Sequence, residues 1–189
     1  MRIISGTHKG KRLIAPKKLP VRPTTDFAKE GLFNILRNRF SFDEIIVLDL
    51  YAGTGNISYE FASRGVIEIT CVDTHYACIS FINRISEELA FPIHTIKSDV
   101  FNFLSKSSGT YDIIFADPPY QIDLGDFKSL IEYVYNSKMI KPSGNLIIEH
   151  SKHTNLSEFK GYIESRRYGG SVFSFFGNLE IENIQLKLK

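Results

Sequence analysis

Residues 45–55 read IIVLDLYAGTG, a continuous apolar run with one carboxylate near its end, followed by a glycine-rich turn. A run without polar alternation predicts a strand buried on both faces, as in a parallel sheet. Gly53 and Gly55 permit a tight turn and allow a ligand to approach the backbone amides closely. The stretch therefore predicts the first strand of a parallel sheet and a turn that can bind a ligand. A purely structural loop is the alternative interpretation, because a glycine-rich turn alone is a weak signal.

The same unit, a strand followed by a helix, repeats outward from this stretch. Further strands are predicted over residues 67–72, 93–96, 112–116 and 146–149. Helices are predicted over residues 26–39, 56–64, 75–90, 100–105 and 127–135, with Gly65 closing the second. This alternation predicts an α/β fold of the Rossmann-like kind, a mostly parallel seven-stranded sheet with helices on both faces.

The two ends of the chain depart from the alternating pattern. Gly177-Asn178 separates two apolar stretches, 172–176 and 181–188, which predicts a C-terminal antiparallel hairpin. Residues 3–14 are broken by two glycines and predict a small β-hairpin outside the main sheet. We therefore expect two parts, a basic N-terminal hairpin or arm over 1–25 and a main domain over 26–189.

Composition indicates a soluble globular protein. Of the 189 residues, 43% are hydrophobic and 23% are charged. No apolar run approaches the roughly 18 residues needed to span a bilayer, and the basic N-terminus lacks the apolar segment of a secretory signal. Cys71 and Cys78 form no CxxC pair, so we expect free thiols in the cytoplasm and no membrane association. No Cys/His cluster has zinc spacing, so we expect no structural metal.

Positive charge is concentrated at the N-terminus. Residues 1–25 contain seven of the 23 lysines and arginines and none of the 21 acids. This asymmetry favours a polyanionic partner such as nucleic acid, and a solvated arm explains the charge equally well. The candidate nucleic-acid contacts in this segment are Lys9, Lys11, Arg12, Arg22 and Thr24.

Four carboxylates stand at the carboxyl ends of predicted strands, where open parallel sheets bind ligands: Asp49, Asp73, Asp99 and Asp117. Asp73 can accept both hydroxyl hydrogens of a ribose, and Asp99 can accept from an adenine amino group that Val100 flanks. Both aspartates can equally cap the helices that follow them. The turn lacks the third glycine of GxGxxG and the Lys-Ser/Thr of a phosphate loop. An adenosine ligand without phosphates fits best, and its predicted contacts are Asp49, Tyr51, Ala52, Gly53, Gly55, Asp73, Asp99 and Val100.

The stretch 117–120 reads DPPY and follows the strand predicted over 112–116. An exocyclic amine on a base is a poor nucleophile, and methylating it requires fixing the direction of its two N–H bonds. The Asp117 carboxylate and the Pro118 carbonyl can accept those two hydrogens, and Pro119 keeps the backbone rigid. Tyr120 offers a face on which an unstacked base can lie. The alternative is a strand-terminating turn with a packed tyrosine.

These motifs resemble the class I methyltransferases that use S-adenosylmethionine to modify exocyclic amines. A longer match is similar to the bacterial 16S ribosomal RNA guanine-N2 methyltransferase family. It consists of residues 2–13 (RIISGTHKGKRL), 22–26 (RPTTD), 30–34 (EGLFN), 48–55 (LDLYAGTG), 63–65 (SRG), 117–120 (DPPY) and 167–169 (RYG).

The resemblance implies transfer of a methyl group from S-adenosylmethionine to N2 of a guanine, position 966 in 16S ribosomal RNA. The product cofactor would be S-adenosylhomocysteine. It implies that 1–25 binds RNA, that 26–189 is the methyltransferase domain, and that the catalytic residues are Asp117, Pro118, Pro119 and Tyr120. We expect a monomer that acts on a 30S particle or an assembly intermediate. Three positions depart from the family pattern: Phe27 replaces a basic residue, Lys29 an arginine and Tyr51 a phenylalanine.

Three other functions remain open at this point. A DNA adenine-N6 or cytosine-N4 methyltransferase uses the same chemistry, but no target-recognition domain is visible. A catalytically inactive RNA-binding protein with this fold is a second alternative, and a nicotinamide oxidoreductase is a third. We expect Glu149 to be a solvated strand end, and the phenylalanines at 173, 175 and 176 to be core residues.

Overall fold

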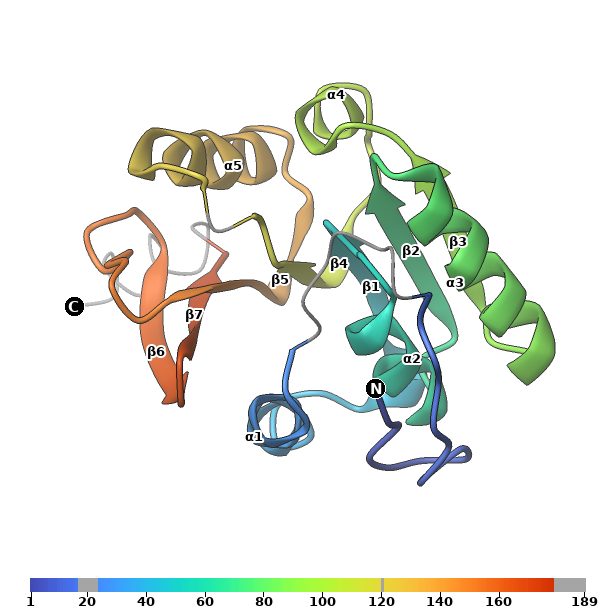
Figure 1. The fold of residues 1–189 in the computed structure, drawn as a ribbon. Helices are drawn as coiled ribbons and strands as arrows, with labels where there is room; N and C mark the ends of the chain where they lie inside the picture. Colours follow the sequence, from blue (N-terminus) through green and yellow to red (C-terminus); the bar gives the residue numbers. More distant parts are fainter. Residues whose placement is uncertain (17–23, 120, 179–189) are drawn as a thin grey trace.

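The computed structural model describes residues 1–16, 24–119 and 121–178 (Figure 1). Its centre is a seven-stranded sheet with the order β3-β2-β1-β4-β5-β7-β6. The strands are β1 (Ile46–Leu50), β2 (Glu68–Asp73), β3 (Ile93–Lys97), β4 (Tyr111–Ala116), β5 (Ile140–Ser151), β6 (Tyr162–Tyr168) and β7 (Ser171–Gly177). Strands β1 to β5 are parallel, and β7 runs antiparallel to β5 and β6. This arrangement confirms the predicted Rossmann-like fold.

Helices cover both faces of the sheet. They are α1 (Asp26–Leu36), α2 (Asn56–Ser63), α3 (Tyr76–Leu89), α4 (Val100–Leu104) and α5 (Leu124–Asn136), with a short 3-10 turn η1 (Phe42–Glu44). One apolar core joins α1, α2 and α3 to one face, and a second joins α4 and α5 to the other. In Figure 1, α4 and α5 lie above the sheet and α1 lies below it.

The position of β1 in the sheet explains why its sequence does not alternate between polar and apolar residues. Val47 and Asp49 point to the face covered by α1 to α3, whereas Leu48 and Leu50 point to the face covered by α4 and α5. All four side chains are buried, because β1 lies between β2 and β4 with a helical layer on each side. Because β1 pairs in parallel with β2 and β4, the carboxyl ends of these three strands lie at one edge of the sheet.

The C-terminal antiparallel arrangement is confirmed, but the predicted pairing of strands is wrong. The hairpin joins β6 to β7 through Gly169-Gly170, and β5 occupies the other edge of β7. Both edges of β7 are therefore filled, and the stretch 181–188 lies outside the described residues. The sequence did not reveal β6 because its outer edge and much of its surface face solvent, which leaves it rich in polar residues. Strand β5 begins at Ile140, six residues before the strand predicted over 146–149, and its start pairs irregularly with β4.

The N-terminal segment forms a small hairpin outside the seven-stranded sheet. Arg2 and Arg12 form an antiparallel bridge, and the Ile3 amide donates to the Lys11 carbonyl at 3.0 Å. Ile3 and Leu13 are buried in the core formed with α1 and α2. Gly6 has a positive φ of 84°, and a Cβ there would lie 1.7 Å from the Ser63 carbonyl oxygen. The hairpin therefore packs directly against the end of α2.

Within the described part of the chain, we find no helix of the length and apolar character that crossing a membrane requires.

Candidate active site

A cavity of about 390 Å³ lies at the carboxyl ends of β1, β2 and β4. It brings together ten of the residues predicted from the sequence: Thr24, Asp49, Tyr51, Ala52, Gly53, Asp73, Val100, Asp117, Pro118 and Pro119. It is also lined by seven residues that the sequence reasoning did not single out: Thr54, Asn56, Ile57, Thr74, His75, Phe115 and Gln121. Each of these lies within two residues of a predicted site residue, so proximity to the motifs was the available signal.

The glycine-rich turn between β1 and α2 has an unusual backbone. Tyr51, Gly53 and Gly55 all have positive φ, at 60°, 54° and 75°. A non-glycine residue in this region stores strain, which is typical of sites that bind ligands. Gly55 does not line the cavity, and a Cβ there would lie 2.8 Å from the Tyr59 ring. Gly55 therefore allows close packing beneath the turn, while Gly53 lines the cavity directly.

Asp73 ties the turn to the start of α3. One carboxylate oxygen accepts from the Gly53 amide at 2.8 Å, and the other accepts from the His75 amide at 2.8 Å. Each carboxylate oxygen has further acceptor capacity. The carboxylate can therefore fix the backbone and still accept hydroxyl hydrogens from a ribose in the cavity.

Asp49 lies deeper, with only 2% of its surface exposed. Burial raises the pKa of Asp49 to about 7, the charge of Asp73 adds to this effect, and the hydrogen bond from Ser58 opposes it. The Ser58 hydroxyl donates to Asp49 at 2.5 Å and accepts from the Cys71 thiol at 3.0 Å. A buried acid that needs compensation for its charge suits a cationic ligand.

Of the neighbouring residues Asp99 and Val100, only Val100 lines the cavity. Asp99 is exposed, does not line the cavity, and caps α4 by accepting from the Asn102 amide at 3.0 Å. Val100 is buried and does line the cavity. The negative charge of Asp99 still reaches the cavity wall, because it adds to the burial that raises the pKa of Tyr51 to about 12.

Asp117 ends β4 and opens onto the cavity. Its amide donates to the Leu50 carbonyl at 3.3 Å, which holds the exit from β4 against β1. Pro118 is buried and Pro119 is exposed, and both line the cavity. The pKa of the Asp117 carboxyl is raised well above its usual range, first by burial and then by the charges of Glu149 and Asp49. Tyr120 lies outside the described residues.

The expectation that Glu149 is a solvated strand end is wrong. Glu149 is 4% exposed, and its carboxylate accepts from the Thr24 hydroxyl at 2.8 Å. In the register of β4 and β5, Ala116 pairs with Ile148, so Asp117 and Glu149 follow side by side. Glu149 is buried because β7 covers it on one side and the segment before α1 covers its end.

A buried polar cluster fixes the segment that contains Thr24. Asn56 donates to the Thr24 carbonyl at 2.9 Å and accepts from the Lys29 ammonium at 2.9 Å. Lys29 is 1% exposed and also lies 3.5 Å from Glu60, which accepts from the amides of Ile4 and Ser5. The cluster thus joins the N-terminal hairpin, α1 and α2 around one wall of the cavity. No sequence pattern indicated that Lys29 is buried, because a lysine in a helix is usually solvated.

The candidate RNA contacts of the N-terminal hairpin lie outside the cavity. Lys9, Lys11 and Arg12 are exposed, and Lys11 forms an ion pair with Glu88 at 2.8 Å. Among the residues that the structure describes, Lys9 and Arg12 form no ion pair with an acid. Arg22 lies outside the described residues.

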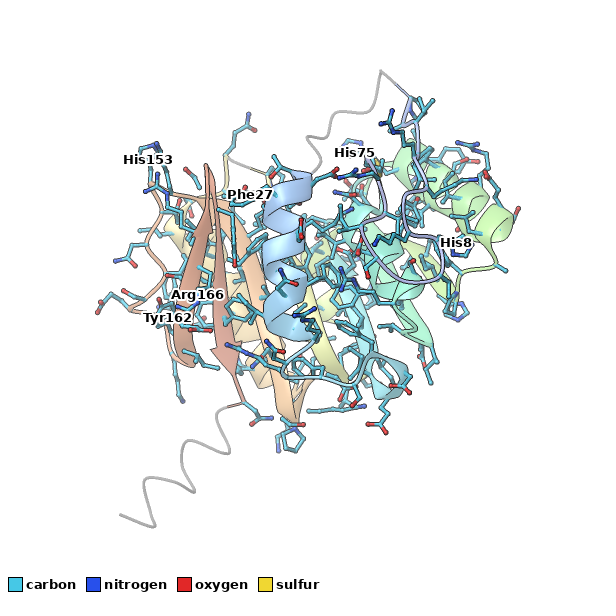
Figure 2. All side chains as sticks on the ribbon, turned by 90° about the horizontal axis from the view of Figure 1, so that it is seen from below. His8, Phe27, His75, His153, Tyr162 and Arg166 are labelled. Atoms are coloured by element: carbon cyan, nitrogen blue, oxygen red, sulfur yellow. The ribbon has the colours of Figure 1, made fainter. Side chains whose placement is uncertain are left out.

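A larger hollow of about 610 Å³ lies elsewhere, between α1 and β6. Figure 2 shows Phe27 at one end of α1 and Arg166 on the neighbouring strands. Arg166 and Arg39 both form ion pairs with Glu164 there, so the Glu164 carboxylate in this hollow already has cationic partners. None of the predicted site residues lines this hollow, so the smaller cavity at the strand ends is the candidate active site.

Solved structures show the class of fold. A hypothetical protein of Thermus thermophilus matches with a TM-score of 0.81 and 24% identity, over 94% of this chain and 99% of that one. The Thermus thermophilus 16S rRNA N2 G1207 methyltransferase, solved with AdoMet and guanosine, matches with a TM-score of 0.69 and 20% identity, over 85% of this chain and 45% of that one. These likenesses show that the chain has a Rossmann-like fold.

Sequence comparison identifies the family. The model described as conserved hypothetical protein 95 matches residues 1–177. The ribosomal RNA small subunit methyltransferase D of Buchnera aphidicola subsp. Baizongia pistaciae is 30% identical over 82% of this chain and 78% of its own. The enzyme of the same name from Buchnera aphidicola subsp. Acyrthosiphon pisum is 32% identical over 82% and 80%. The chain belongs to this family, the family of ribosomal RNA small subunit methyltransferase D.

Proposed function

We propose that this protein transfers a methyl group from S-adenosylmethionine to the exocyclic N2 of a guanine in 16S ribosomal RNA, with guanine 966 as the expected site. The observation that supports this most directly is the convergence of Asp117 and Pro118 with Asp49, Asp73 and the glycine-rich turn around one cavity. The names of the relatives, ribosomal RNA small subunit methyltransferase D, support ribosomal RNA as the substrate.

The residues present fit the cofactor. Asp73 has acceptor capacity for ribose hydroxyls beyond its bonds to the Gly53 and His75 amides. Asp49 and Asp73 offer negative charge to a cation, and the cavity wall formed by Val100 and Ile57 is apolar. When bound, S-adenosylmethionine supplies an activated methyl group, and the electron pair of the broken C–S bond stays on sulfur.

The chain's own contribution is to position the amine. Asp117 and the Pro118 carbonyl accept the two N–H hydrogens, which directs the nitrogen lone pair away from them and toward the methyl group. Forming the N–C bond places a positive charge on that nitrogen. Asp117 is the acceptor nearest to the amine in this arrangement, and it takes the proton that the nitrogen then loses. Most of the acceleration comes from positioning, because the methyl group needs no further activation.

The basic N-terminal hairpin is the proposed contact to the RNA outside the cavity. Lys9 and Arg12 are exposed cations on an element that the cluster around Lys29 fixes to the active-site wall. Phosphate contacts of this kind position a substrate without reading its sequence. We expect Arg22 and Thr24 to extend this contact toward the flipped base, and the protein to act as a cytoplasmic monomer on a 30S particle or an assembly intermediate.

The deciding experiment maps the product. Unmodified 30S particles are incubated with the protein and S-adenosylmethionine, and the 16S RNA is digested and analysed by mass spectrometry. We expect one additional methyl group on a guanine, assigned to N2 by its fragmentation. A methyl group on a different base, or methylation of DNA in preference to RNA, would overturn the proposal. Free 16S RNA tested in parallel shows whether the assembled particle is required.

A further inference from the structure

A half-buried acid, Asp117, and a buried acid, Glu149, lie side by side at the ends of neighbouring strands. Asp117 ends β4 and Glu149 lies near the end of β5, directly beyond the register pair Ala116 and Ile148. Asp117 lines the cavity, whereas Glu149 does not and is 4% exposed. Glu149 therefore influences anything in the cavity through Asp117, and not by contact with a ligand.

The surroundings favour a charged Glu149 over a charged Asp117. Glu149 accepts a hydrogen bond from Thr24 at 2.8 Å, and Ser171 of β7 also acts to lower the pKa of Glu149 against the larger effect of burial. In the described part of the chain, no side-chain or backbone donor forms a hydrogen bond with the Asp117 carboxyl, and no lysine or arginine forms an ion pair with either acid. Two carboxylates so close together cannot both ionise easily, and the one with donors keeps the charge more readily.

The other titratable groups that face this pair are also acidic. Asp49 of β1 faces Asp117 on the same side of the sheet, and Asp73 of β2 faces Asp49. Burial and the charge of Glu149 both raise the pKa of Asp117. On the β7 side, the residue in register with Glu149 is Phe173, which has no charge. Three aspartates thus line the cavity, and among the described residues no lysine or arginine lines it.

We propose that Glu149 is a positioning residue that keeps a proton on Asp117 while the cavity is empty, so that a cationic ligand expels this proton and leaves Asp117 as an anionic acceptor. This inference rests on the proposed function, because it assigns Asp117 the amine hydrogens. The expelled proton goes to solvent. Asp117 thus becomes a competent acceptor only when the cofactor is present.

The proton balance closes over one reaction cycle. Methyl transfer consumes the positive charge on sulfur, and the proton lost by the amine returns to Asp117. When S-adenosylhomocysteine leaves, Asp117 therefore carries a proton again, as it does in the ligand-free protein. We therefore expect proton release on binding S-adenosylmethionine and much less on binding S-adenosylhomocysteine, whose sulfur is neutral.

The test uses calorimetry of the full chain with each of the two ligands, in buffers that differ in ionisation enthalpy. This measures the number of protons released, with no RNA present. In Glu149→Gln the pKa of Asp117 is raised less, so more of Asp117 is ionised before binding and proton release on binding S-adenosylmethionine falls below the wild-type value. The control Asp112→Asn likewise replaces a carboxylate by an amide, at the opposite end of β4, and leaves proton release unchanged. Equal release by wild type and Glu149→Gln would assign the proton to Asp49 and overturn the inference.

A second measurement does not depend on the cofactor or on methylation. In the ligand-free protein, a proton held by Asp117 makes the free energy of unfolding fall as pH rises from about 4. Burial also raises the pKa of Glu149 itself, so the contribution of Asp117 is measured as the difference between each protein and its Asp117→Asn variant. We expect this difference to vary less with pH in a Glu149→Gln background. An equal pH dependence with and without Glu149→Gln would refute the inference even if the enzyme methylates RNA, and it is also what a merely structural role for Glu149 predicts. Conversely, a reduced pH dependence in a protein that does not methylate RNA would refute the proposed function alone.

Discussion

Thr24 and Glu149 are 125 residues apart in the sequence and are joined by a buried hydrogen bond of 2.8 Å. Thr24 belongs to the segment that leads into α1, and Glu149 belongs to β5 next to the catalytic candidate Asp117. The segment proposed to contact RNA is therefore bonded to the residue that borders the methyl-acceptor site. Thr24 also lines the cavity, so this one contact joins the segment before α1 to the cavity wall and to β5.

Asp117→Asn should abolish methyl transfer and leave the affinity for S-adenosylhomocysteine, whose sulfur is neutral, nearly unchanged. The amide retains one acceptor oxygen but cannot take the proton from the amine, so we expect a rate loss of at least about 100-fold. Single-turnover methylation of 30S particles measures the rate, and calorimetry measures the affinity. A variant that methylates at the wild-type rate would remove Asp117 from the mechanism.

Asp73→Asn should weaken binding of S-adenosylmethionine by about 10- to 100-fold, because it removes the charge that accepts from the Gly53 and His75 amides. Asp99→Asn is the matched control, since Asp99 caps α4 outside the cavity. We expect the control to change the dissociation constant by less than about threefold. A larger effect for Asp99 would mean that the bound adenine reaches it, as its position in the sequence first indicated.

Gly55→Ala should destabilise the fold by about 2 kcal/mol or more, because positive φ and a contact with the Tyr59 ring add together. Gly10→Ala has a similar φ of 86° but meets no atom within 4 Å, so it isolates the backbone contribution. Chemical denaturation of both variants gives the two free energies of unfolding. Equal losses would show that the packing beneath the turn adds nothing.

Local patterns in the sequence were sufficient for the parallel core and for the acids at strand ends. The run before Asp49 and the DPPY stretch each report a strand end within a few residues, and open sheets place such ends together. The burial of Glu149 and Lys29 was not predictable in this way. Glu149 is covered by Thr24 and by β7, and Lys29 is held by Asn56 and Glu60, all of them distant in sequence. Solvation is the usual state of both residue types, so only the tertiary structure reveals the exception.

Replacing Lys9 and Arg12 with alanine should weaken RNA binding and flatten its dependence on salt concentration. Each lost phosphate contact reduces the slope of log affinity against log salt by about 0.7 to 0.9. Lys128→Ala is the control, because this lysine is exposed on α5 and pairs only weakly with Glu132 at 3.8 Å. Filter binding at several salt concentrations gives the slopes. An unchanged slope in the double variant would make the hairpin a solvated surface with no part in binding.

Asp49→Asn should stabilise the ligand-free protein at pH 8 and have little effect on its stability at pH 4. The folded-state pKa of Asp49 is about 7, above the ordinary value of 3.8 that applies to the unfolded chain. Between these values the folded state binds a proton that the unfolded state has lost, so the free energy of unfolding falls as pH rises. The fall attributable to Asp49 is about 4 kcal/mol and is nearly complete about one pH unit above the folded-state pKa of about 7. Urea denaturation at closely spaced pH values measures it, and Asp112→Asn again controls for net charge. If Asp49→Asn follows the wild-type curve from pH 4 to pH 8, Asp49 is already ionised in the empty cavity and has no role in balancing the charge of a cationic ligand.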